Sequence, residues 1–207
     1  GDTGRSLYFF SGGKGQYLVK NKKMTAPSFD SFGWLWVAES DGAVRAYNAA
    51  STNEKERSKG IEIPVSWRSG MTFSSLRISH DGARVVVVGT RDGTAAVVMS
   101  GVVRDSSGTP KGFTEPVRVT SSITPRTAVW AGEQNLVVVN DKTGESEVTT
   151  LSGEETKFDR LDGVKSVSAA GNTSNMLAHR SDGSCYVLEE RGWNRLNTST
   201  REMSFAG

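Results

Sequence analysis

Two aspartates come nearest to a reactive pair in this 207-residue chain. Asp30 and Asp81 each lie in a glycine-containing turn, at what we interpret as equivalent places in successive units of the sequence. A glycosidase needs two carboxyl groups that face each other across a cleft. A turn aspartate also has a simpler use, because its carboxylate accepts hydrogen bonds from the backbone of its own turn. The sequence favours this simpler use and keeps a glycosidase or lactonase as the less favoured alternative.

The other side chains that could act in catalysis or bind a metal are isolated from one another in the sequence. His80 and His179 are far apart in the chain, and neither has a partner at the spacing of metal ligands. The single cysteine, Cys185, excludes an internal disulfide and is expected to be a small buried apolar residue in a strand. No G-x-S-x-G nucleophile motif is present. We therefore predict a protein that is not an enzyme, with no catalytic residues, no cofactor and no metal site.

Five tryptophans are the candidates for a binding surface. Trp34 and Trp36 are two residues apart and so point to the same side of one expected strand. Trp67, Trp130 and Trp193 lie in three further parts of the chain. We expect these rings to pack between sheets, as aromatic residues commonly do. The alternative is an exposed aromatic platform that binds sugar, for which Trp67 is the first candidate.

A repeated pattern of strands and turns positions these residues. Four units share an inner segment, a turn, an apolar run, a second turn and an alternating segment; their first turns are PSFDSFG (27–33), RISHDGA (77–83), AVWAGEQ (128–134) and SVSAAGN (166–172). Aspartate or asparagine beside glycine allows the positive φ that tight hairpins require. The second turns recur about 40 to 50 residues apart, which is the period of β-propeller blades.

These repeats predict an all-β fold, a β-propeller of five four-stranded blades in a single domain over residues 1–207. The run Val85–Val88 supports it, because a continuously apolar strand is covered on both faces. The first strands, around 7–10, have no inner strand before them, so we expect residues 201–207 to complete a closing blade shared by the two termini. An open stack of four blades is the alternative. Residues 51–60 are expected to form a solvated loop, because they carry no apolar stripe.

The charge and hydropathy of the chain limit its partners. Twenty-five basic and 23 acidic residues give a net charge of +2. This balance is not the basic footprint of a nucleic-acid-binding protein, and no apolar run is long enough to span a bilayer. The first residues also lack the pattern of a signal peptide. We expect either a cytosolic protein or the excised part of a longer one.

Two motifs carry a family resemblance. They are Pro27-Ser28-x-Asp30-x-x-Gly33-x-x-Trp36 and Leu76-Arg77-Ile78-Ser79-x-Asp81-Gly82-x-Arg84-Val85. Together they resemble the carboxyl-terminal β-propeller of the LpqB family of actinobacterial cell-envelope lipoproteins. The resemblance implies a lipid anchor on the outer face of the cytoplasmic membrane and a GerMN domain before the propeller. It also implies association with the sensor kinase MtrB of the MtrA–MtrB two-component system.

The family has no established catalytic residues, so the resemblance assigns none here. This sequence has no lipobox cysteine, and no GerMN-like region precedes residue 1, which we interpret as an excised domain of a longer lipoprotein. The resulting expectation is a monomeric, extracytoplasmic interaction module whose partner is the extracytoplasmic domain of an MtrB-like kinase. Its only membrane attachment would be a lipid anchor outside this fragment. A propeller that binds cell-wall glycan is the alternative, and the sequence assigns no partner-binding residues.

Overall fold

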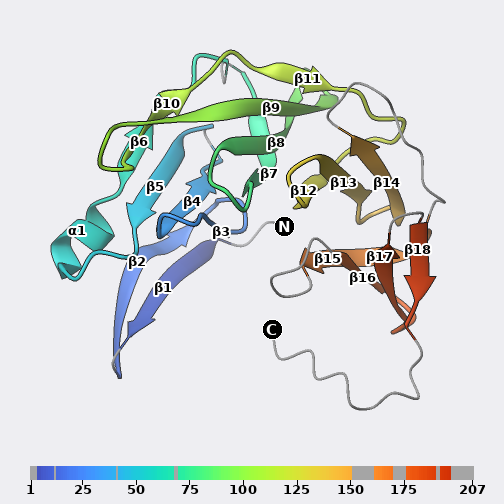
Figure 1. Cartoon of the computed structure of the whole chain (residues 1–207), viewed down its shortest axis with the longest axis horizontal. Helices are drawn as coiled ribbons and strands as arrows, with labels where there is room; N and C mark the ends of the chain where they lie inside the picture. Colours follow the sequence, from blue (N-terminus) through green and yellow to red (C-terminus); the bar gives the residue numbers. More distant parts are fainter. Residues whose placement is uncertain are drawn as a thin grey trace. The chain divides into compact units, whose positions relative to one another are not determined.

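The computed structural model describes residues 4–11, 13–40, 42–67, 70–150, 161–169, 176–189 and 192–196. The chain divides into two compact units, Gly1–Val119 and Thr120–Gly207. In the described parts the strands form five small antiparallel sheets, labelled in Figure 1. The secondary structure is therefore almost entirely β, as the repeated turns predict.

The first unit contains three of these sheets. A hairpin of β1 (Arg5–Ser11) and β2 (Lys14–Lys22) comes first. The second sheet has the order β3 (Ser28–Phe29), β4 (Trp34–Ala38), β5 (Val44–Asn48) and β6 (Ile61–Ile63). The third contains β7 (Thr72–Ile78), β8 (Arg84–Arg91), β9 (Thr94–Arg104) and β10 (Pro110–Phe113), with β11 (Val117–Val119) also paired to β9.

The second unit contains the other two sheets. One has the order β12 (Thr127–Ala131), β13 (Asn135–Asn140) and β14 (Glu145–Thr150). The other has the order β15 (Val164–Ala169), β16 (Met176–Arg180), β17 (Cys185–Glu189) and β18 (Gly192–Arg195). Each of the four predicted repeat units thus corresponds to one sheet in chain order, which confirms the interpretation of the turn signals.

The two kinds of predicted turn are both present. Asp92 (φ 51°) and Gly93 (φ 78°) both have positive φ, the requirement of a type I′ hairpin. In the first-turn class, the N–H of Ser79 donates to the carbonyl of Arg84 (2.9 Å), and the N–H of Gly82 donates back to the carbonyl of Ser79 (2.9 Å). The positive φ of Gly82 (73°) closes this turn at a position where a residue with a Cβ would be strained.

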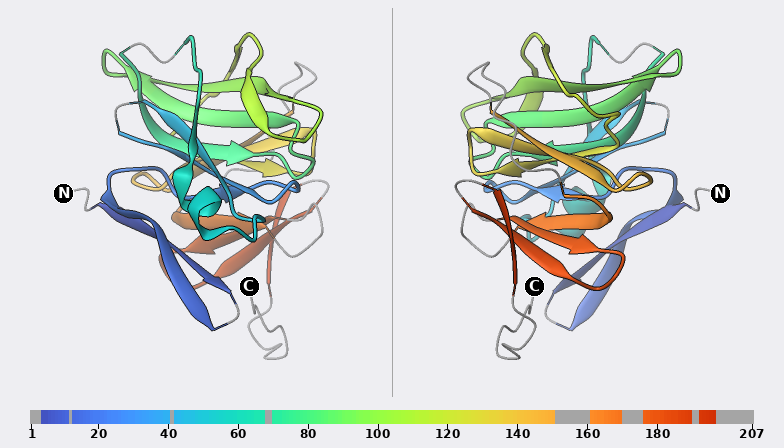
Figure 2. Two further views of the ribbon diagram at one scale, coloured as in Figure 1. Left: turned by 90° about the vertical axis from the view of Figure 1, so that its left-hand side faces the viewer. Right: turned by 90° about the vertical axis from the view of Figure 1, so that its right-hand side faces the viewer.

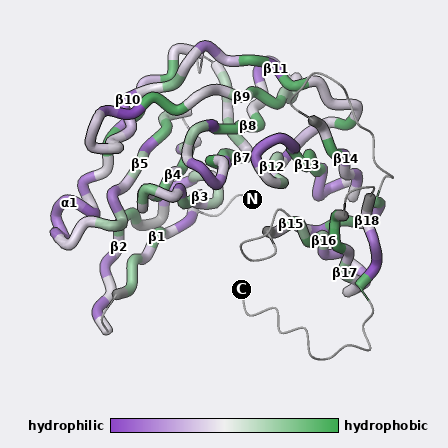
Figure 3. The backbone as a smooth tube through the Cα atoms, in the orientation of Figure 1, coloured by the Kyte–Doolittle hydropathy of each residue, from purple (hydrophilic) through white to green (hydrophobic). Residues whose placement is uncertain are grey.

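The valine run lies in the core as expected. All four residues of Val85–Val88 on β8 are buried, with 1% or less of their surface exposed. Successive side chains of a strand point to opposite faces, so both faces of β8 are covered. Figure 3 shows how apolar residues follow the strands while polar residues gather at the turns. Trp36, Leu76 and Val85 belong to one apolar cluster within the first unit.

The prediction of a solvated loop at 51–60 is wrong, because a short helix, α1 (Glu54–Lys59), forms there. The Asn53 carboxamide oxygen caps it by accepting from the N–H of Lys55 (2.9 Å). The helix buries none of its own residues, in keeping with its missing apolar stripe. It lies beside β2 (Figure 2), where the Gln16 side chain donates to the carbonyl of Glu54 (2.8 Å). These contacts with a distant strand stabilise a helix that its own sequence does not predict.

Some predictions fall on residues outside the described part of the chain. They include the closing blade, because residues 201–207 are not described. The shared blade therefore stays a prediction. Among the described residues, no helix is long and apolar enough to cross a lipid bilayer.

Candidate functional site

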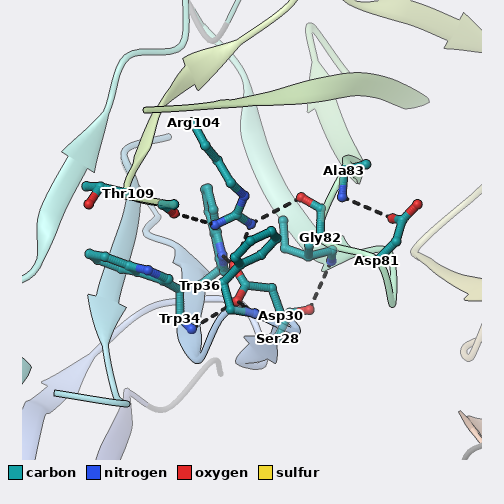
Figure 4. A network of polar contacts seen from close by, with 12 residues as sticks. Ser28, Asp30, Trp34, Trp36, Asp81, Gly82, Ala83, Arg104 and Thr109 are labelled. Atoms are coloured by element: carbon teal, nitrogen blue, oxygen red, sulfur yellow. Dashed lines mark hydrogen bonds and ion pairs between the residues drawn. The ribbon is translucent and has the colours of Figure 1, made fainter. Parts of the chain in front are cut away.

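The carboxylate of Asp30 accepts four hydrogen bonds within the first unit (Figure 4). Its Oδ1 accepts from the backbone N–H groups of Phe32 (2.8 Å) and Trp34 (2.9 Å). Its Oδ2 accepts from the indole Nε1 of Trp36 (2.8 Å) and from Nη2 of Arg104 (2.7 Å). The side chain of Asp30 is fully buried. Four donors therefore satisfy this carboxylate.

Arg104, at the end of β9, connects three turns through its guanidinium. Besides the ion pair with Asp30, its Nη2 donates to the carbonyl of Gly82 (3.1 Å). Its Nη1 donates to the carbonyl of Gly108 (2.9 Å). The planar fork of arginine suits such a set of fixed acceptors better than the single ammonium of lysine does. The guanidinium thus ties the sheet β3–β6 to the sheet β7–β10.

Asp81 lies in a separate turn with its own partners. Its Oδ1 accepts from the hydroxyl of Ser79 (2.6 Å) and from the N–H of Ala83 (3.0 Å). The Ser79 hydroxyl, followed by the Ala83 N–H, lowers the pKa of the Asp81 carboxyl below its usual range. Both aspartates serve the backbone of their own turns, which is the simpler of the two uses predicted from the sequence.

The expected equivalence of the two aspartates is wrong in detail. The N–H of Asp30 donates to the carbonyl of Trp34, and the N–H of Gly33 donates to the carbonyl of Asp30. Ser79 and Gly82 make these same two bonds in the next sheet, so the counterpart of Asp30 is Ser79. The sequence hides this because one extra residue separates Gly82 from the strand that follows. The geometry therefore does not present Asp30 and Asp81 as a matched pair of carboxylates.

The histidines and the cysteine remain scattered. His80 is exposed in its turn, and His179 is half-buried on β16. Cys185 lies in a strand, β17, as expected, but the prediction that it is buried is wrong, because it is only half-buried there. Burial raises the pKa of the Cys185 thiol, which keeps it protonated at neutral pH. Within the described part of the chain, no group of three or more histidine, cysteine, aspartate or glutamate side chains could hold a metal ion.

Two phenylalanines beside Asp30 are exposed, and the sequence interpretation missed them. Phe29 is 62% exposed and Phe32 is 50% exposed. The guanidinium carbon of Arg104 lies 4.2 Å from the centre of the Phe32 ring. The sequence did contain a signal for this exposure: two aromatic residues flank an aspartate in a turn, where polar residues are usual.

Comparison with known proteins identifies the family. The model of the lipoprotein LpqB β-propeller domain matches residues 1–203. The chain belongs to the LpqB β-propeller family. A curated relative, lipoprotein LpqB of Streptomyces avermitilis, is 27% identical over 131 residues, which are 61% of this chain and 21% of the relative. The chain therefore spans about a fifth of that relative's length.

Two solved structures are similar in fold. The carboxyl-terminal WD40 domain of Sif2 has a TM-score of 0.53 at 13% identity, covering 93% of this chain and 52% of that one. A chain of the nidogen/laminin complex has a TM-score of 0.56 at 11% identity, covering 84% and 64%. At these identities the likeness concerns the fold alone. Together with the family match, it confirms the predicted all-β propeller class.

The motif that suggested the LpqB family is largely a set of structural contacts. The Ser28 hydroxyl accepts from the N–H of Ile78 (2.9 Å) and so joins β3 to β7. Asp30 and Trp36 supply the hydrogen bonds described above. Gly33 (φ 84°) lies so close to Ala50 that an added Cβ would be 2.5 Å from the Ala50 Cβ. The family signature therefore records how one sheet is closed and joined to the next.

The tryptophans of this LpqB-family chain mostly pack inside their units. Trp34 and Trp36 are buried. Trp67 packs on the core cluster, with its ring 5.8 Å from Phe73 and 6.3 Å from Phe113, and Trp193 packs on the cluster of the second unit. Trp130 is half-buried. The structure thus places Trp67 in a packing contact, whereas the glycan hypothesis requires an open face.

Proposed function

We propose that this chain is the non-catalytic interaction module of an LpqB-like lipoprotein, and that it binds the extracytoplasmic part of an MtrB-like sensor kinase and modulates it. The observation that carries the proposal is the family match over residues 1–203. The hydrogen bonds of Asp30 and Asp81 agree with a non-catalytic module, because these two candidate carboxylates accept from groups within the protein that stabilise their turns. The kinase belongs to the proposal and is inferred from the family resemblance.

The same proposal places the domain outside the cytoplasmic membrane. The curated relative is a lipoprotein, and a lipid-anchored protein can hold a folded module close to a membrane kinase. Anchoring would raise the effective concentration of the two partners, so a modest affinity between them is sufficient. We therefore expect binding by the isolated propeller to be of micromolar strength.

The direct test is titration calorimetry of the purified propeller with the purified extracytoplasmic domain of the kinase. We expect saturable binding with a dissociation constant of about 1–50 μM, which corresponds to roughly 6–8 kcal/mol. Since the net charge is only +2, the affinity should change little with salt. The extracytoplasmic domain of an unrelated kinase is the control. No heat with the isolated propeller, and none with the full-length protein, would remove the proposal.

A cell-wall glycan is the second candidate ligand, favoured by one observation. Tyr8 and Tyr17 are 56% and 49% exposed on the β1–β2 hairpin, and their ring centres are 4.8 Å apart. Aromatic rings with polar tips are suited to contact sugar. If the glycan binds there, purified cell-wall polymer should retain the unchanged protein in a pull-down but not the Tyr17→Ala variant. Retention that depends on Trp67 would instead support the site first expected from the sequence.

A further inference from the structure

The ring of Phe32 is half-exposed, yet it packs against charged and backbone groups of the protein. One face lies on the Arg104 guanidinium at 4.2 Å. The backbone of two glycines also approaches the ring: an added Cβ would lie 2.9 Å from it at Gly82 and 3.2 Å from it at Gly108. The ring therefore rests on a support made of one cation and two residues without side chains.

This support includes buried charges. Arg104 and Asp30 keep 10% and 0% of their side-chain surface exposed. The Nε atom of Arg104 is buried and has no hydrogen-bond partner among the described residues. A buried ion pair contributes little net stability, because removing both charges from water costs about as much as their attraction returns. Stability alone is therefore a weak reason for this arrangement, whereas a fixed position for the ring is a consequence of it.

Phe29 is a second exposed aromatic residue in the same short segment of the chain. It is 62% exposed and lies on β3, three residues before Phe32. An aromatic ring that is already packed on the protein, as that of Phe32 is, loses little conformational entropy on binding, and a few such residues can dominate an interface. We call Phe29 and Phe32 together the Phe29–Phe32 surface.

We propose that the Phe29–Phe32 surface is the docking site on which a protein partner places an apolar side chain. The inference rests on the proposed function, since it assigns the surface through which the kinase's extracytoplasmic domain would be bound. It goes beyond that function by naming the residues and the chemistry of the contact.

The charges around the surface decide which class of partner it fits. The cation beneath Phe32 occupies one face of the ring and draws its electron density inward, so the outer face is a poor site for a second cation. Asp30 neutralises Arg104, and both Nη atoms of Arg104 already donate within the protein. The remaining donor of the Arg104 guanidinium among the described residues, Nε, is buried and so is not presented to a phosphate or to the hydroxyls of a sugar. An aliphatic or aromatic side chain is the complement that remains.

The test compares variants in the same calorimetric titration with the kinase's extracytoplasmic domain. We expect the Phe29→Ser/Phe32→Ser protein to bind at least about tenfold more weakly than the unchanged protein, as loss of a central aromatic contact typically does. The matched control is Phe10→Ser/Val117→Ser, which removes two other exposed apolar side chains (67% and 57%) from the same unit. It should bind with unchanged affinity. Circular dichroism and thermal midpoints establish that both variants are folded.

The outcomes separate the two proposals. Binding by the unchanged protein that the Phe29→Ser/Phe32→Ser change leaves intact overturns the docking surface and keeps the proposed function. An equal loss in the Phe10→Ser/Val117→Ser control also overturns it, because the effect would then be general. If the unchanged protein does not bind the kinase domain at all, the proposed function fails, and this assignment fails with it. If the double variant is misfolded, Phe32→Leu, which keeps the residue apolar but removes the flat ring, decides by the same criterion.

Discussion

At the residue scale, the account depends on the different burial of two aspartates. Asp30 is fully buried and accepts four hydrogen bonds, one of them from Arg104. Asp81 is partly exposed and bonds only within its own turn. The two aspartates look alike in the sequence, but we expect Asp30 to contribute much more than Asp81 to the free energy of unfolding.

Replacing Asp30 with asparagine tests this difference. The Asp30→Asn change keeps the shape of the side chain but leaves the Arg104 cation buried without a counter-charge, so we expect a loss of about 3–5 kcal/mol in the free energy of unfolding. Asp81→Asn is the control and should cost less than about 1 kcal/mol. Urea unfolding measures both, and equal losses would contradict the structural role assigned to Asp30.

The pKa of Asp81 supplies a second prediction at this scale. The Ser79 hydroxyl is the largest cause of its lowering, so Ser79→Ala should bring the Asp81 pKa back towards its usual range in an NMR titration. A lowered folded-state pKa adds stability above the unfolded pKa, and this contribution is lost as the pH falls through the folded value. The difference in stability between Ser79→Ala and the unchanged protein should therefore shrink in acid. The low pKa of Asp182, which depends on Ser184, is the internal control and should not move.

At the element scale, the repeated turns could be predicted from the sequence, whereas the contacts that join them could not. Asp-Gly and the other glycine-containing turn signals need only local backbone geometry, so they located the sheets correctly. The ion-pair partner of Asp30, Arg104, is 74 positions away, and the local sequence around either residue does not predict the pair. Helix α1 was missed for a related reason, because Gln16 of a distant strand contacts it. The pattern of a single sequence does not show which residues distant in the chain contact each other.

The turn glycines test how closely adjacent turns are packed. Gly82 (φ 73°) and Gly93 (φ 78°) have nearly the same backbone strain when replaced, roughly 1–2 kcal/mol for alanine. An added Cβ at Gly82 would meet the Phe32 ring at 2.9 Å and Arg104 Nη2 at 3.1 Å, whereas at Gly93 it meets nothing within 4 Å. Gly82→Ala should therefore destabilise the protein by about 1–3 kcal/mol more than Gly93→Ala does. Equal midpoints in urea for the two variants would show that the ring is not supported as described.

At the scale of the whole molecule, the chain divides into two compact units, Gly1–Val119 and Thr120–Gly207. The repeat pattern predicts one propeller domain over residues 1–207, and a single domain unfolds in one cooperative step. We therefore expect one calorimetric transition for the chain, with equal calorimetric and van't Hoff enthalpies. Two resolved transitions would indicate two independent domains and contradict the prediction.

The same scale holds the central claim, that this LpqB-family propeller is an interaction module that binds through the Phe29–Phe32 surface. The most direct measurement is an NMR titration of the isotopically labelled 22.3 kDa chain with the extracytoplasmic domain of the kinase. The account predicts that the amide signals of residues 29–33, 80–82 and 106–108 shift first and furthest, since these turns surround the Phe32 ring. Shifts confined to other segments, such as the exposed aromatic face of the β1–β2 hairpin, or no shifts at all, would contradict it.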